Sequence, residues 1–152
     1  MALTPECHTR TIVHNMATHG PVVVVDTSAV LAVLLREPSR DALIALTEGR
    51  SLIAAPSLPW EVGNALIAGL RRRKVTAKAV QLAWASYVQI PVRLLHVDVP
   101  AALDLASSLG LYAYDAYVLE ATRAARAPLL TLDAALDRAA RSIGLTVMEL
   151  PE

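Results

Sequence analysis

The stretch Val22-Val23-Val24-Val25-Asp26-Thr27-Ser28 decides how the rest of this 152-residue chain is interpreted. Four consecutive β-branched residues predict a strand that is buried on both faces, as in the interior of a parallel sheet. The run ends on the carboxylate of Asp26, and a helical pattern follows over residues 28–35. Ligands of open α/β sheets bind at the carboxyl ends of the strands, so Asp26 stands where a functional acid is expected. Taken alone, Asp26 is equally consistent with a plain helix N-cap.

The composition indicates one domain with a large core. Hydrophobic residues make up 55% of the chain, yet no apolar run reaches the roughly 18 residues that a membrane span needs, so no membrane association is expected. Lys+Arg and Asp+Glu both number 14, so a nucleic acid would have to be bound by a local basic patch. The single cysteine, Cys7, cannot form an internal disulfide, which favours a reducing, cytoplasmic compartment.

Residues 1–20 differ from the rest of the chain. They hold three of the four histidines and the only cysteine, with no sustained periodicity. Tracts rich in Cys and His can bind metal, but this spacing matches no zinc pattern. No apolar segment typical of a secretory signal is present. We therefore expect a flexible leader over residues 1–20 and one folded domain over residues 21–152.

From Pro21 onward, predicted strands alternate with predicted helices. Strands are expected at 22–25, 52–55, 92–95, 128–131 and 145–148, and helices at 28–35, 39–48, 57–73, 76–89, 99–110, 113–127 and 134–143. Ser57 and Asp98 are the expected N-caps of two of these helices. Short strands separated by helices predict an α/β fold: a parallel sheet of about five strands, flanked by helices on both faces.

Three further acids are expected at the same edge of the sheet as Asp26. Asp133 follows a predicted strand, while Glu61 and Asp115 lie in the first turns of predicted helices. A helix cap for Asp133 and a helix-dipole role for Glu61 are the structural alternatives. Four carboxylates at one edge would repel one another unless a cation neutralised them. A donor set made only of oxygen suits Mg²⁺ or Mn²⁺ rather than Zn²⁺.

Four blocks occur in a specific order: Val23–Ala29, Trp60–Leu66, Tyr114–Ala121 and Pro128–Asp133. Together they resemble the PIN-domain family, and within it the VapC toxins of bacterial toxin–antitoxin pairs. The resemblance implies a Rossmann-like sheet and a metal-dependent endoribonuclease that uses Mg²⁺ or Mn²⁺, cuts RNA, forms a homodimer and is neutralised by a VapB-like antitoxin. It also implies a set of functional residues: the acids Asp26, Glu61, Asp115 and Asp133 as catalytic residues and metal ligands, with Thr27, Ser28 and Thr131 as supporting polar residues.

A run of four cations, Arg71-Arg72-Arg73-Lys74, ends the predicted helix 57–73. One or two cations would satisfy the helix dipole, so the longer run favours contact with RNA or with a partner protein. Asp137, one turn beyond Asp133, is a further candidate for the acidic pocket.

Two consecutive predicted helices, 57–73 and 76–89, carry Trp60 and Trp84. An apolar groove between these helices would suit an antitoxin segment, and the alternative is that both tryptophans are ordinary core residues.

Two other interpretations compete with the nuclease. A non-catalytic PIN-like module would bind RNA or protein without cutting, but the presence of all four acids disfavours it. A phosphoacceptor receiver domain would need paired acids after the first strand and a lysine near the last strands. The chain has Thr27 and Ser28 after Asp26 and no lysine beyond Lys78, which disfavours a receiver.

Overall fold

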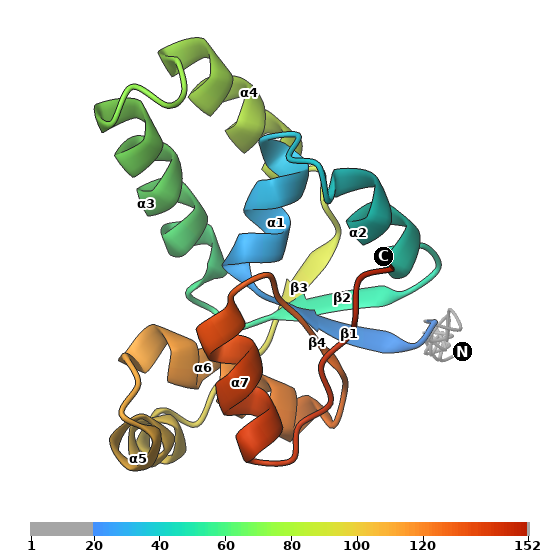
Figure 1. Ribbon diagram of the computed structural model, residues 1–152, viewed down its shortest axis with the longest axis vertical. Coiled ribbons are helices and arrows are strands. Elements are labelled where there is room, and N and C mark those ends of the chain that lie inside the picture. The colour runs from blue at the N-terminus through green and yellow to red at the C-terminus, as the bar shows by residue number, and fades with distance from the viewer. Residues whose placement is uncertain (1–19, 152) are drawn as a thin grey trace, which may run out of the picture.

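The computed structural model describes residues 20–151, so the predicted leader lies outside the described residues apart from Gly20. Within them, four strands form one parallel sheet in the order β3-β2-β1-β4 (Figure 1). The strands are β1 (Val22–Val25), β2 (Ser51–Ala54), β3 (Val92–Leu94) and β4 (Leu129–Leu130). The predicted α/β class with a parallel sheet is confirmed.

The expected fifth strand at residues 145–148 is reduced to an isolated parallel bridge between Leu129 and Val147. Two backbone hydrogen bonds support it: Leu129 N donates to Thr146 O at 2.9 Å, and Met148 N donates to Leu129 O at 2.8 Å. The physical reason is the shortness of β4. With two residues, β4 offers the last segment too little backbone for a longer ladder.

Helices cover both faces of the sheet, as predicted (Figure 1). One face is covered by α1 (Thr27–Leu34), α2 (Arg40–Thr47), α3 (Leu58–Arg71) and α4 (Ala77–Tyr87), and the other by α5 (Val99–Leu109), α6 (Ala113–Ala125) and α7 (Ala134–Ser142). The Asp98 side chain caps α5 as expected, by accepting from Ala101 N at 3.2 Å. The expected cap by Ser57 is wrong: its hydroxyl is buried and makes no cap bond with α3.

Each face of the sheet has its own apolar core. Successive side chains of β1 point to opposite faces, so Val23 and Val25 join the core under α1 to α4 while Val24 joins the core under α5 to α7. All three are nearly inaccessible to solvent. Burial on both faces is the physical reason why β1 is an uninterrupted β-branched run.

The strand order creates a crevice at one edge of the sheet. The chain runs from β1 outward to β2 and β3, then returns to the other side of β1 as β4. Such a reversal is the switch point at which α/β sheets bind ligands. Val25 pairs with Leu130, so the residues that follow the two strands, Asp26 and Thr131, leave the sheet side by side.

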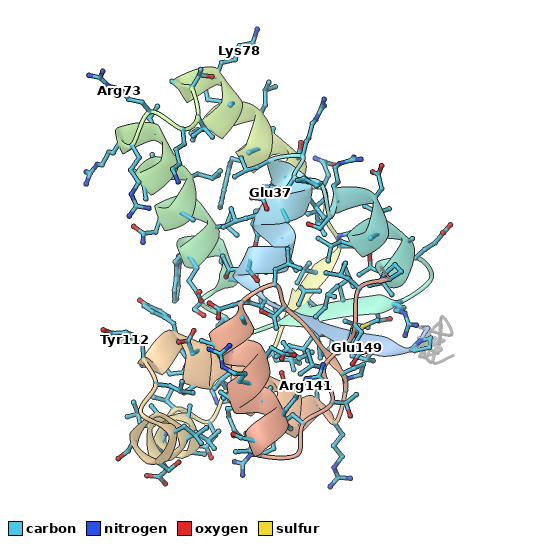
Figure 2. All side chains as sticks on the ribbon, in the orientation of Figure 1. Glu37, Arg73, Lys78, Tyr112, Arg141 and Glu149 are labelled. Atoms are coloured by element: carbon cyan, nitrogen blue, oxygen red, sulfur yellow. The ribbon has the colours of Figure 1, made fainter. Side chains whose placement is uncertain are left out.

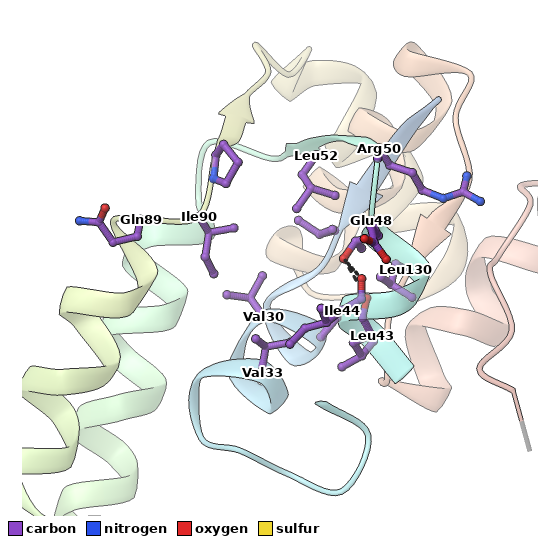
Figure 3. Close-up of a pocket in the computed structure, with 15 residues that line it drawn as sticks. Val30, Val33, Leu43, Ile44, Glu48, Arg50, Leu52, Gln89, Ile90 and Leu130 are labelled. Carbon is purple, nitrogen blue, oxygen red and sulfur yellow. Dashed lines mark hydrogen bonds between the residues drawn. The ribbon is translucent and has the colours of Figure 1, made fainter. Parts of the chain in front are cut away.

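A cavity of about 600 Å³ opens away from this edge, between α1, α2 and the segment 89–91 (Figure 3). Apolar side chains such as Val30, Leu43 and Ile90 form much of its wall, and none of the candidate acids lines it. Within residues 20–151, no helix is long and apolar enough to cross a membrane.

Candidate active site

Asp26 ends β1 and is only 7% exposed. Its Oδ2 atom accepts three hydrogen bonds: from Ser28 Oγ at 2.6 Å, from Ser28 N at 3.2 Å and from Thr131 Oγ1 at 2.9 Å. The bond from Ser28 N is the N-cap of α1, so the capping alternative is correct. The two hydroxyl bonds exceed what a cap requires and fix the orientation of the carboxylate.

Ser28 and Thr131 join the ends of β1 and β4. Their hydroxyl oxygens lie 3.2 Å apart, and each also accepts from the backbone that follows β4. Leu132 N donates to Ser28 Oγ at 2.9 Å, and Asp133 N donates to Thr131 Oγ1 at 3.0 Å. The two hydroxyls therefore position Asp26 and the chain leading to Asp133.

Glu61 lies in the first turns of α3, facing the start of α1. Its Oε2 atom accepts from Thr27 Oγ1 at 3.1 Å. Its Oε1 atom is buried and has no hydrogen-bond partner among the described residues. A buried carboxylate oxygen without a partner is unfavourable, so this atom is suited to facing a cation or a donor from a ligand.

Asp115 lies in the first turn of α6, and its pKa is affected by the other three predicted acids. Burial raises the pKa of the Asp115 carboxyl above its ordinary value of 3.8. The negative charges of Asp133, Asp26 and Glu61 raise this pKa further, in that order. The structure thus brings the four predicted acids, hereafter the acidic quartet, into one electrostatic site at the switch point.

Asp133 is exposed and also serves as a cap. Its Oδ1 atom accepts from Ala135 N at 2.7 Å and from Leu136 N at 3.0 Å, at the start of α7. Asp137 is different: its Oδ1 atom accepts from Arg141 Nε at 2.9 Å in a surface ion pair. Asp137 was only a further candidate for the acidic pocket, and in the structure its carboxylate pairs with Arg141 on the same helix.

The acidic quartet fits a divalent cation in its donor chemistry. All of its ligand atoms are carboxylate oxygens, and Glu61 Oε1 has no partner among the described residues. Across residues 20–151, however, no three acidic, His or Cys side chains are arranged as a group that holds a metal ion. The carboxylates of Asp133, Asp26 and Glu61 lie close enough to Asp115 to raise its pKa.

A pocket of about 490 Å³ adjoins the acidic quartet, and we call it the aromatic pocket. Its walls come from three helices: Thr27 of α1, Trp60, Glu61, Asn64 and Ala65 of α3, and Tyr114 of α6.

Trp60 is 70% exposed, so its interpretation as a core residue is wrong. The face of α3 that packs on the sheet carries Leu58, Val62 and Leu66, and Trp60 lies off that face. Sequence reasoning missed Asn64 and Tyr114. The signal that was available for Asn64 is its spacing of four residues from Trp60, which places both on one side of a helix.

The basic cluster Arg71–Lys74 lies at the far end of α3, and Figure 2 shows Arg73 there, pointing away from the body of the molecule. All four side chains are exposed. At 1.5 Å per residue, Arg71 lies about 15 Å along the helix axis from Glu61. The cluster therefore does not belong to the acidic site itself.

Helices α3 and α4 carry large apolar side chains at the surface. Trp84 and Tyr87 form a tilted ring pair with centroids 5.0 Å apart, and Trp84 is 41% exposed. Ile67 on α3, Leu82 on α4 and Val88, which directly follows α4, are exposed as well. Large apolar side chains exposed on two neighbouring helices favour contact with another chain.

Comparison with protein families identifies most of the chain. Residues 23–142 match the family model described as PIN domain. Among curated proteins, none matches the chain.

Three solved structures share the fold over nearly their whole length. The VapC20 toxin of Mycobacterium tuberculosis, described as cleaving the sarcin-ricin loop, is 16% identical with a TM-score of 0.61, covering 85% of this chain and 99% of that chain. VapBC2 of Rickettsia felis, bound to a DNA fragment from its promoter, is 11% identical with a TM-score of 0.61, covering 86% and 99%. FitAcB of Neisseria gonorrhoeae is 15% identical with a TM-score of 0.58, covering 84% and 96%.

Proposed function

Because this chain belongs to the PIN-domain family, we propose that it is a divalent-metal-dependent endoribonuclease of the VapC type, the toxin of a toxin–antitoxin pair acting in the cytoplasm. The observation that carries the proposal is the gathering of the acidic quartet at the switch point of the sheet, where the charges of the other three acids reach Asp115 and help raise its pKa. Such a site is suited to gathering Mg²⁺ or Mn²⁺.

In this proposal Asp26, Glu61, Asp115 and Asp133 hold the cation. The bound cation would neutralise the phosphodiester and favour deprotonation of the attacking water. Ser28 and Thr131 keep Asp26 in one orientation through their hydroxyl bonds, and Thr27 does the same for Glu61. These three hydroxyl residues act as positioning residues, because each touches a carboxylate.

The similarity to toxin–antitoxin proteins and the exposed apolar surface support a proposal for the partners. We propose a homodimer and a small VapB-like antitoxin whose apolar segment covers the exposed side chains of α3 and α4. An antitoxin arginine that reaches the acidic quartet would form charge-assisted bonds where the cation binds. Antitoxin and Mn²⁺ would then compete, so Mn²⁺ titrated into the complex should weaken it, and sedimentation of the toxin alone should give a dimer. An antitoxin affinity that ignores both Mn²⁺ and Asp→Asn changes in the quartet would exclude this mode of inhibition.

The basic cluster is proposed to contact the RNA backbone or the partner at a distance from the scissile bond. Variants in which the charge of the basic cluster is reversed distinguish contact with RNA from contact with the partner. Loss of RNA affinity that shrinks at high salt would assign it to RNA, whereas loss of antitoxin affinity alone would assign it to the partner.

The decisive experiment is sequencing of RNA 5′ ends after a pulse of expression. Wild-type protein should generate new ends at defined sites, and Asp26→Asn should generate none. Asp137→Asn is the matched control, since it removes a surface carboxylate outside the quartet. If Asp26→Asn produces the same ends as wild type, the nuclease proposal fails. RNA binding without new ends from any variant would favour the non-catalytic module.

A further inference from the structure

The aromatic pocket contains two large rings that the fold does not bury. Trp60 is 70% exposed and Tyr114 is 53% exposed, yet both line the same pocket as Thr27 and Glu61. The sequence neighbour of Tyr114 is Asp115, and that of Trp60 is Glu61, so each ring is attached next to a member of the acidic quartet. The rings therefore lie beside the place where a phosphodiester would bind.

We propose that Trp60 and Tyr114 hold an unpaired base of the RNA that adjoins the scissile phosphate. The inference rests on the proposed nuclease function and deepens it. Sequence-tolerant recognition of single strands relies on aromatic rings on which bases stack. At about 490 Å³, the pocket has the size of a small-molecule site and so can accept a nucleoside.

Asn64 adds a polar contact to the same pocket. It is exposed and lies one turn beyond Trp60 on α3, so the amide and the indole are on one side of the helix. An amide carries both a donor and an acceptor and can bond the edge of a stacked base. The rings would then provide affinity for any base, and Asn64 would provide a preference among bases.

Neither ring is explained by packing. The sheet-facing side of α3 is filled by Leu58, Val62 and Leu66, so removing the indole leaves the core intact. Tyr114 makes an edge-on contact with Tyr117, with centroids 5.8 Å apart, and remains half exposed. Tyr112 is a useful contrast, because it is 85% exposed on the same segment but does not line the pocket.

Fluorescence tests the stacking directly, in the Asp26→Asn background so that no RNA is cut. Trp84→Phe leaves Trp60 as the single tryptophan, and Trp60→Phe leaves Trp84 as the control emitter. The probes are single-stranded RNA oligonucleotides of about eight nucleotides, the same sequence as a duplex, and an abasic ribose-phosphate chain of equal charge. Trp60 emission should be quenched by the single strand only, and Trp84 emission should be unaffected by all three. Equal binding of the abasic chain, without quenching of Trp60, would overturn the proposal.

Cleavage kinetics of the otherwise wild-type protein give the second readout. Trp60→Ala and Tyr114→Ala should each raise KM for a single-stranded substrate about tenfold, with much less change in kcat. Trp60→Phe should restore most of the affinity, and Tyr112→Ala is the matched control. If RNA is cut but KM is unchanged in Trp60→Ala, the base pocket is wrong while the nuclease function stands. If Trp60→Ala instead abolishes assembly with a partner protein and leaves RNA binding intact, the ring belongs to the partner surface and the proposal is also overturned.

Discussion

The hydroxyl of Thr131 donates a 2.9 Å hydrogen bond to the carboxylate of Asp26, across 105 positions of sequence. The two residues meet because β1 and β4 are parallel neighbours that end at the same level, with Val25 paired to Leu130. The same register brings Ser28 within 3.2 Å of Thr131. A small set of hydroxyls thus fixes the acid at the end of the first strand before any ligand binds.

Replacing Asp26 separates its chemistry from its structural role. All three hydrogen bonds end on Oδ2, so Asp26→Asn can keep them through its amide oxygen, while relief of repulsion within the quartet offsets their weakening. We expect no cleavage and an unchanged Tm without divalent cations. Asp26→Ala should also be inactive but less stable by about 1–3 kcal/mol, because buried hydroxyls lose their acceptor. An Asn variant that melts as early as the Ala variant would show that the charge itself is structural.

Thr131 is expected to matter for both stability and activity. Thr131→Val keeps the shape of the side chain but removes the hydroxyl that bonds Asp26 and Asp133 N, which should cost about 1–3 kcal/mol in urea unfolding. The turnover number should fall as well, since Asp26 loses one of its restraints. Thr131→Ser retains the hydroxyl and should recover most of both quantities. A valine variant with normal turnover would exclude a positioning role.

The stability of the cation-free protein should depend on pH through Asp115. Its folded-state pKa lies above the ordinary value of 3.8, so the folded state binds more protons than the unfolded state between the two values. The free energy of unfolding therefore falls as pH rises through that window. Asp115→Asn has no carboxyl group to ionise at this position. Its free energy of unfolding should therefore match that of wild type at acidic pH and exceed it at neutral pH. A stability difference that is the same at every pH would contradict this linkage.

Divalent cations should stabilise the protein by neutralising the carboxylates of the quartet. Mg²⁺ or Mn²⁺ is expected to raise the Tm of wild type. When the cation concentration is one hundred times its dissociation constant, the free energy of unfolding should increase by about 2.7 kcal/mol. The rise should vanish in the Asp26→Asn, Asp115→Asn double variant and persist in Asp137→Asn. An equal rise in the double variant would place the cation elsewhere. Zn²⁺ should not substitute in the cleavage assay, and activity with Zn²⁺ alone would contradict an oxygen-only site.

The N-terminal segment should be dispensable up to Gly20. Deleting residues 2–19 is expected to leave Tm and cleavage nearly unchanged, in keeping with the aperiodic composition of that segment. Gly20→Ala should destabilise by about 1–3 kcal/mol, because an added Cβ would overlap the carbonyl oxygen of Gly49. A large loss of Tm on deletion would mean that the segment contributes to the fold.

The sequence by itself determined the fold class and most of the elements, the fifth strand excepted. The β-branched run of β1 indicates burial on both faces from neighbouring residues alone. Caps such as Asp98 can also be predicted locally, because they bond backbone groups only a few residues away. The nomination of Asp26, Glu61, Asp115 and Asp133 also came from sequence, since each stands just after a strand or early in a helix.

Only the tertiary structure decided which side chains work together. The bond between Thr131 and Asp26, the exposure of Trp60 and the surface ion pair of Asp137 all depend on strand order and on which side of a helix meets the sheet. The length of β4 was equally a tertiary outcome, since the sequence predicted a strand over residues 128–131 and the structure has only Leu129–Leu130. Local patterns carry no information about such contacts, since their energies come from residues that are distant in sequence and adjacent only after folding.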